Sequence, residues 1–278
     1  MDTAEHLLAQ AIAAGAEAAE VYQSTSLEKL GSFEGNRLKQ VETTQADGVA
    51  LRLWKGGKPG LAVGHGPIDP TVIVEKALAI STLNEPEMPQ LVDGTSKDFG
   101  AIGNSVAIES LIEQGKEAIA QIRDRFPEAI CEASVSCDVE QVRLLTSTGL
   151  DYRWQDTTLG GYINAELVDQ DDFLNVGSGL VTRDLIDLTS ISSDILRRMT
   201  WASRVVEATP NQSDSVQMPV IFTAGAADIL WDTLRSALNG KRVQEGTSPW
   251  REKWGERVIS DLITLRQDPT AGPYSTPF

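Results

Sequence analysis

The sequence predicts an α+β fold, in which antiparallel sheets carry flanking helices. Segments that alternate between apolar and polar residues come in runs, and these runs are bracketed by segments of helical periodicity. A doubly wound parallel sheet would instead alternate strand and helix one by one. The 278 residues are 41% hydrophobic and 23% charged, which is typical of a globular protein with a sizeable core.

The first part of the chain predicts a helix, several strands and a second helix. The first helix spans residues 3–14 and ends at Gly15. The Gly56–Gly60 run separates two strands as a hairpin loop slightly longer than the tightest type. Asp69 and Pro70 then begin a helix that reaches about residue 82. The expected strands lie at 21–27, 30–33, 37–44, 48–55 and 60–64.

The middle of the chain repeats this order. Residues 84–104 are rich in Pro, Gly, Asp and Ser and predict a surface loop. A helix with a continuous apolar stripe follows at about 106–126, and another at about 190–207. Because helix, strands and helix occur in both 1–82 and 106–207, we hypothesise an internal duplication within an N-terminal domain of residues 1–208. The expected strands lie at 130–137, 140–147, 150–156, 159–168 and 173–182.

The stretch from Pro219 to Arg242 opens a second domain, 209–278. An apolar run at Val216–Thr223 predicts a buried strand, and small residues after it predict a tight turn. A buried helix follows, and Gly240 supplies its stop signal. The apolar positions that fall on one face of this helix are Ile229, Leu230, Thr233, Leu234, Ala237 and Leu238.

This region and several segments before it resemble the TldD/PmbA family, also called the modulator of DNA gyrase family. The shared features near the end are a proline-led apolar strand, a helix that ends in a small-Leu-x-Gly step, the segment Ser248–Pro269 and the closing phrase Ser275–Phe278. Upstream matches are Glu20–Tyr22, Gly48–Val63 and Thr146–Gly149. The resemblance implies that a strand-rich domain follows, so residues 209–278 are interpreted as the start of a C-terminal domain whose remainder is absent.

In the TldD branch of the family, the helix carries a zinc-peptidase HExxxH motif. Alignment of the small-Leu-x-Gly step places Trp231 on the first histidine, Asp232 on the glutamate and Ser236 on the second histidine, and Pro219–Gly240 contains no His, Cys or Glu. The resemblance therefore implies the PmbA/TldE branch, whose members lack the metal site and pair with a TldD-type subunit. We expect no catalytic residue, no metal ligand and no cofactor in this chain, with zinc only in the partner. A plain core helix without chemistry is the alternative interpretation.

The resemblance implies a component of a TldD/TldE-type metallopeptidase assembly that degrades unfolded peptides in the cytoplasm. This chain would be its non-catalytic subunit, although the family as a whole is one of hydrolases. The alternative is a non-catalytic module that binds a peptide or a protein, either in peptide maturation or as a gyrase-modulator type of partner. An HExxxH-bearing homologue in the same genome would favour the first function over the second.

Charge and residue counts exclude other classes of protein. The net charge is −16, from 40 acidic and 24 basic side chains, so direct binding of nucleic acid is not expected. No apolar stretch is long enough to cross a membrane, and no basic signal-peptide region is present, which predicts a cytoplasmic protein. Cys131 and Cys137 are expected to be buried free thiols. His6 and His65 are expected to be residues without a catalytic role.

A locally basic, aromatic segment stands out in this acidic chain. Trp250, Arg251 and Trp254 follow the helix that carries Trp231, and interface cores are enriched in aromatic residues and arginine. We interpret these three residues as a candidate interface. They would equally serve as packing for the absent part of the C-terminal domain.

Overall fold

The computed structural model describes residues 3–169, 172–202, 219–272 and 274–276. These form two compact units, one of residues 1–205 with 269–278 and one of residues 206–268. The larger unit contains, in chain order, α1 (Thr3–Ala13), β1 (Ala18–Glu34), β2 (Arg37–Lys55), β3 (Lys58–His65), α2 (Pro70–Ser81), β4 (Ser96–Ile102), α3 (Ile108–Arg125), β5 (Ile130–Thr146), β6 (Asp151–Asp169), β7 (Asp172–Thr182) and α4 (Leu188–Ala202). The predicted α+β class is confirmed.

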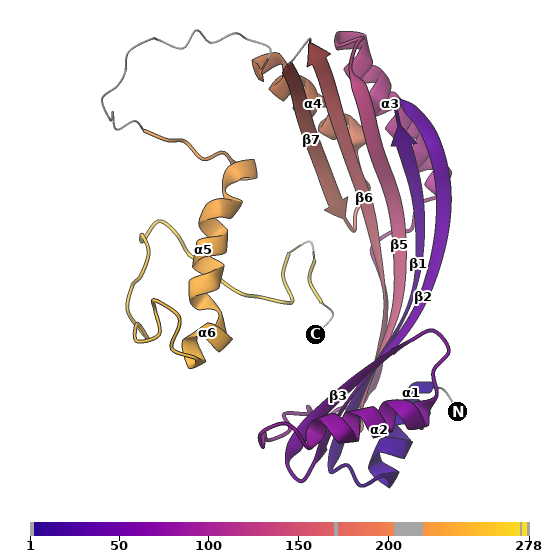
Figure 1. Ribbon diagram of the computed structural model, residues 1–278, viewed down its shortest axis with the longest axis vertical. Coiled ribbons are helices and arrows are strands. Elements are labelled where there is room, and N and C mark those ends of the chain that lie inside the picture. The colour runs from indigo at the N-terminus through magenta and orange to yellow at the C-terminus, as the bar shows by residue number, and fades with distance from the viewer. Residues whose placement is uncertain (1–2, 170–171, 203–218, 273, 277–278) are drawn as a thin grey trace. The chain divides into compact units, whose positions relative to one another are not determined.

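The strands of the larger unit form a single seven-stranded sheet (Figure 1). Its order is β3-β2-β1-β5-β6, and β4 and β7 both pair with β6. All neighbours are antiparallel except β4, which runs parallel to β6. Helix, three strands and helix occur in each half of this unit, with β4 between the halves. The two hypothesised repeats therefore meet edge to edge in one sheet, through the long strands β1 and β5.

The four helices among the described residues of the larger unit pack on one face of the sheet, in two pairs. Residues that alternate along a strand point to opposite faces, and the core residues of β1 beyond Ala18, such as Ala19, Val21 and Phe33, are odd-numbered. Near α1 and α2, the core contains Leu7, Ala11, Leu51, Leu53, Ile73 and Ala77. Near α3 and α4, it contains Leu111, Ile122, Val135, Leu159, Ile163 and Ile195. Figure 1 shows each helix pair at its own end of the strands.

Glycines shape both the turn between β2 and β3 and the contact between β3 and α2. Gly56 and Gly57 both have positive φ, at 59° and 70°, and join β2 to β3 in a two-residue turn between the paired Lys55 and Lys58. The predicted longer loop was wrong, because Pro59 and Gly60 belong to β3. A Cβ atom on Gly60 would lie 1.9 Å from the main-chain oxygen of Ala77, so only glycine lets α2 pack this closely.

Several predicted elements take a different form in the structure. Short predicted strands fuse into the long β1, β2, β5 and β6. Residues 84–104, predicted as loop, contain β4, which is mostly exposed and lacks the apolar alternation that reveals a strand in sequence. The described part of the predicted 190–207 helix is α4, and its last residues lie outside the described ranges.

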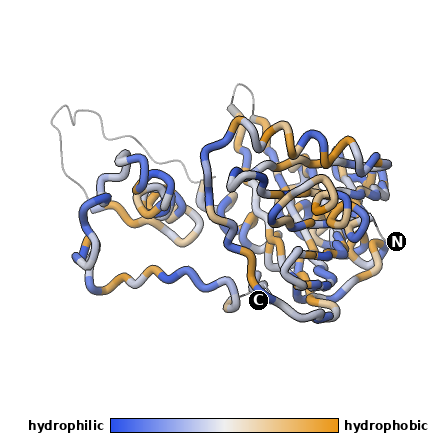
Figure 2. Tube along the Cα trace, turned by 90° about the horizontal axis from the view of Figure 1, so that it is seen from below, coloured by the Kyte–Doolittle hydropathy of each residue, from blue (hydrophilic) through white to orange (hydrophobic). Residues whose placement is uncertain are grey.

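The smaller unit contains a short 3₁₀ turn (Ala224–Ala226), α5 (Asp228–Leu238) and α6 (Gly240–Gln244). The predicted helix is present, but the prediction that it is buried was wrong, because Ala237 is its one buried residue. Ile229 is 67% exposed and Leu238 is 52% exposed. Residues 219–223 form no strand, since no described residue pairs with them, and 216–218 lie outside the described ranges. Figure 2 shows apolar segments, in orange, in this unit as well as in the larger one.

Candidate functional site

The candidate residues of the smaller unit lie on α5 and in the segment after α6. The start of α5 follows Ala227, where no side chain supplies a capping hydrogen bond. At its other end, Asn239 accepts a hydrogen bond from the Arg242 amide and so begins α6. Ser248 Oγ donates to the main-chain oxygen of Ala237, at 2.6 Å, and accepts from the Trp250 amide at 3.0 Å. These bonds fold the tryptophan segment back onto the end of α5.

The sequence prediction places three residues of α5 on the positions of the HExxxH motif. In that prediction Trp231 and Ser236 stand at the histidine positions and Asp232 at the glutamate position. Zinc requires imidazole, thiolate or carboxylate ligands, and Asp232 alone carries such a group. Its carboxylate pairs with Arg235 one turn along the helix, and the Ser236 hydroxyl accepts a hydrogen bond from Arg242. Among the described residues, no group of three or more His, Cys, Asp and Glu side chains gathers into a candidate metal site.

Two of the three candidate interface residues line an apolar hollow of about 450 Å³ in the smaller unit. Trp250 and Trp254 both line it, and Trp254 is 88% exposed. Arg251 donates a hydrogen bond to the main-chain oxygen of Gly246, at 2.7 Å, and is itself exposed. The aliphatic side chains that complete the hollow are Ala237, Leu238, Val243 and Val258. An exposed tryptophan beside an apolar hollow suits binding of a protein or peptide, and the assignment as an interface stays a prediction.

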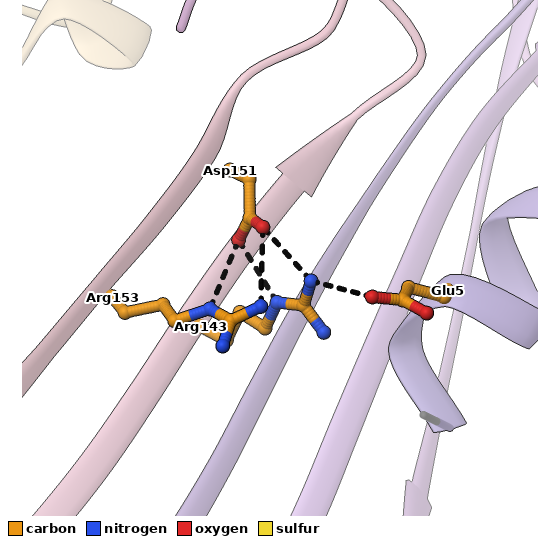
Figure 3. Close-up of polar contacts among 4 residues, drawn as sticks. All are labelled: Glu5, Arg143, Asp151 and Arg153. Carbon is orange, nitrogen blue, oxygen red and sulfur yellow. Dashed lines mark hydrogen bonds and ion pairs between the residues drawn. The ribbon is translucent and has the colours of Figure 1, made fainter. Parts of the chain in front are cut away.

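In the larger unit, a buried arginine links a helix to the sheet (Figure 3). Arg143 on β5 is 9% exposed and makes two hydrogen bonds to Asp151 on β6, at 2.9 and 2.8 Å. It makes a third, at 2.8 Å, to Glu5 on α1. The hydrogen bonds from Arg143, together with those from Arg153, lower the pKa of Asp151 from 3.8 to about 2, against an opposing effect of burial.

A polar groove of about 460 Å³ lies next to this cluster, on the face of the sheet that carries the helices. Two rows of side chains cross three strands within it. Gln23, Arg143 and Arg153 stand opposite one another in the first row, and Thr25, Gln141 and Gln155 do so in the second. All of the lining residues belong to strands, so the groove lies between the two helix pairs. Sequence reasoning missed it, because it depends on the register of β1, β5 and β6.

The opposite face of the sheet combines aromatic and acidic side chains. Tyr22 and Trp154 meet edge to face, with ring centroids 6.5 Å apart. Burial, and then the charge of Glu140, raises the pKa of Tyr22. Burial, and then the charge of Asp156, raises the pKa of the Asp138 carboxyl. This part of the face is therefore electrostatically negative, in keeping with the net charge of the chain.

The remaining sequence candidates lie apart from these features. Cys131 and Cys137 are buried free thiols on the helix-bearing face, which confirms the prediction. Burial raises the pKa of Cys131 to about 11. His6 on α1 and His65 at the end of β3 are both exposed. No helix among the described residues is long and apolar enough to cross a membrane.

Comparisons with known proteins relate the last part of the chain to a family model and the larger part of it to the fold of solved structures. Residues 215–278 match the PmbA/TldA metallopeptidase C-terminal domain. The structure of TldE from Thermococcus kodakarensis is similar over 99% of this chain and 63% of its own, with a TM-score of 0.76 and 20% identity. None of the curated proteins matches the chain.

Two further structures share the fold. A putative modulator of a DNA gyrase from Thermotoga maritima is similar over 99% of this chain and 64% of its own, with a TM-score of 0.75 and 16% identity. A putative modulator of DNA gyrase from Bacteroides thetaiotaomicron is similar over 93% of this chain and 61% of its own, with a TM-score of 0.72 and 16% identity. This chain spans less than two thirds of the length of each structure. The predicted recognition of the TldD/PmbA family is confirmed.

Proposed function

We propose that this chain is the non-catalytic, TldE-type subunit of a TldD/TldE-type zinc metallopeptidase assembly that degrades unfolded peptides in the cytoplasm. The observation that carries the proposal is the chemistry of α5, where Trp231, Asp232 and Ser236 occupy the positions of the metal-binding motif. The likeness of the chain to a structure named TldE supports the same branch. The hydrolytic step is assigned to a TldD-type partner, so no catalytic step runs through this chain.

Under this proposal the chain contributes binding surfaces. The hollow beside Trp250 and Trp254 is the candidate contact for the partner subunit, because interfaces concentrate aromatic residues at their centre. The larger unit would hold the peptide. Direct contact with DNA forms no part of the proposal, because a net charge of −16 disfavours it.

The test is an affinity purification of the full-length protein from its own cells, followed by measurement of zinc and of peptide hydrolysis. We expect an HExxxH-bearing protein to co-elute, with zinc and activity in the complex and neither in the isolated chain. Peptide hydrolysis by the isolated, zinc-loaded chain would refute the division of labour. Recovery of the chain alone, metal-free and inactive, would favour the peptide-binding module instead.

A further inference from the structure

The polar groove has a composition that the packing of the fold does not require. On the helix-bearing face, its neighbours in the strands are apolar core residues such as Val21, Leu145 and Leu159. Between them, Gln23, Gln141 and Gln155 place three carboxamides across three adjacent strands. No helix residue lines the groove, so it stays open on the helix-bearing side.

One group in the groove is an acceptor without a donor. Gln23 Oε1 is buried and accepts no hydrogen bond from any described residue. A carbonyl oxygen that lacks a donor away from water is unfavourable, so the lining at Gln23 favours a ligand that brings an N–H group. The neighbouring Gln141 is exposed and Gln155 is half-buried, and each can both donate and accept.

The charges in the groove do not favour an ionic ligand. Arg143 is neutralised by Asp151 and Glu5, and Arg153 also pairs with Asp151. Asp98 adds a carboxylate at one end. A ligand that is neutral and that presents donors and acceptors in alternation matches this lining better than a phosphate or a free carboxylate does. The peptide main chain has this pattern.

We propose that the groove binds the main chain of an extended peptide that crosses β1, β5 and β6. The proposal rests on the proposed function, which supplies the peptide as substrate. Adjacent strands are about 4.8 Å apart, so the path from β1 to β4 measures about 14 Å and takes about four extended residues. Because the carboxamides would contact main-chain groups, the site would hold peptides with little regard to their sequence.

The test measures binding of a fluorescent, uncharged, unfolded octapeptide to the full-length protein by anisotropy. The variant Gln141→Leu/Gln155→Leu removes two donor and acceptor groups, and we expect it to bind about tenfold more weakly. The matched control is Gln40→Leu/Gln90→Leu, which alters two exposed glutamines outside the groove and should bind as the wild type does. Thermal unfolding of all variants checks that they fold.

The peptide itself provides the second arm of the test. N-methylation of alternate residues removes main-chain donors and should weaken binding about tenfold, whereas a scrambled sequence should bind equally well. The inference would be overturned if the peptide did not bind, or if the groove variant bound as tightly as the control variant. It would also be overturned if the scrambled peptide bound differently from the original one. If a zinc partner co-elutes but binding ignores Gln141 and Gln155, the proposed function stands and the groove fails. If replacement of these glutamines weakens binding but no zinc-bearing partner co-elutes, the groove stands and the proposed function fails.

Discussion

Replacement of Asp151 by asparagine tests the link between α1 and the sheet. In the wild type, Asp151 accepts two hydrogen bonds from Arg143, which is 9% exposed and also contacts Glu5. Asp151→Asn keeps the size of the side chain and removes its charge. Arg143 then stays buried and keeps its ion pair with Glu5 but loses the one with Asp151, so the folded state loses free energy relative to the unfolded state.

The magnitude follows from the pKa of Asp151, which falls from 3.8 to about 2 on folding. At neutral pH a shift of this size corresponds to about 2.5 kcal/mol. Because the carboxyl group is partly accessible to water, screening reduces the expected loss to about 1 kcal/mol. A folded-state pKa below the unfolded value means that the stabilisation is complete above about pH 5. It is lost as the pH falls from about 4 to about 2.

The assay measures thermal and urea unfolding of the wild type and of Asp151→Asn at pH 7 and pH 3, with circular dichroism as the readout. We expect the variant to be less stable at pH 7, with a melting temperature lower by about 3 °C, and the difference to shrink at pH 3. Asp93→Asn, at an exposed loop position, serves as the control and should match the wild type at both values. An equal gap at pH 7 and pH 3 would refute the electrostatic account.

Three further predictions concern packing, thiols and metal. Gly60→Ala should lower the free energy of unfolding in urea by about 3 kcal/mol or more, because the new methyl group meets the main chain of α2. The control is Gly225→Ala, which should have little effect because nothing lies within 4 Å of the added Cβ atom. Equal losses of stability in the two variants would contradict the steric account. Cys131 and Cys137 should react with a thiol reagent at pH 8 only after unfolding, and rapid labelling of the native protein would show that they are accessible. Asp232→Ala should leave the zinc content of the purified assembly unchanged, whereas a loss of zinc would place a metal ligand in this chain.

Most elements could be predicted from the sequence, because their patterns are local. The apolar stripe of α3 and the Asp69-Pro70 start of α2 each depend on a few neighbouring residues. The strand β4 could not be predicted, because its exposed residues lack alternation and it becomes a strand by pairing with β6. Nor could the junction of both halves through β1 and β5, since no local pattern specifies which strands become neighbours.

The groove and the burial of α5 also depend on contacts between distant parts of the chain, which local sequence patterns do not predict. Gln23, Gln141 and Gln155 come from three strands, and each looks like an ordinary polar position of an alternating strand. Register alone brings them into line, and a shift of one residue would turn one of them to the opposite face. For α5, the period of the apolar residues predicts which side of the helix is apolar. It cannot predict burial, because burial depends on what packs against that side, and Ile229 is accordingly exposed despite its position in the stripe.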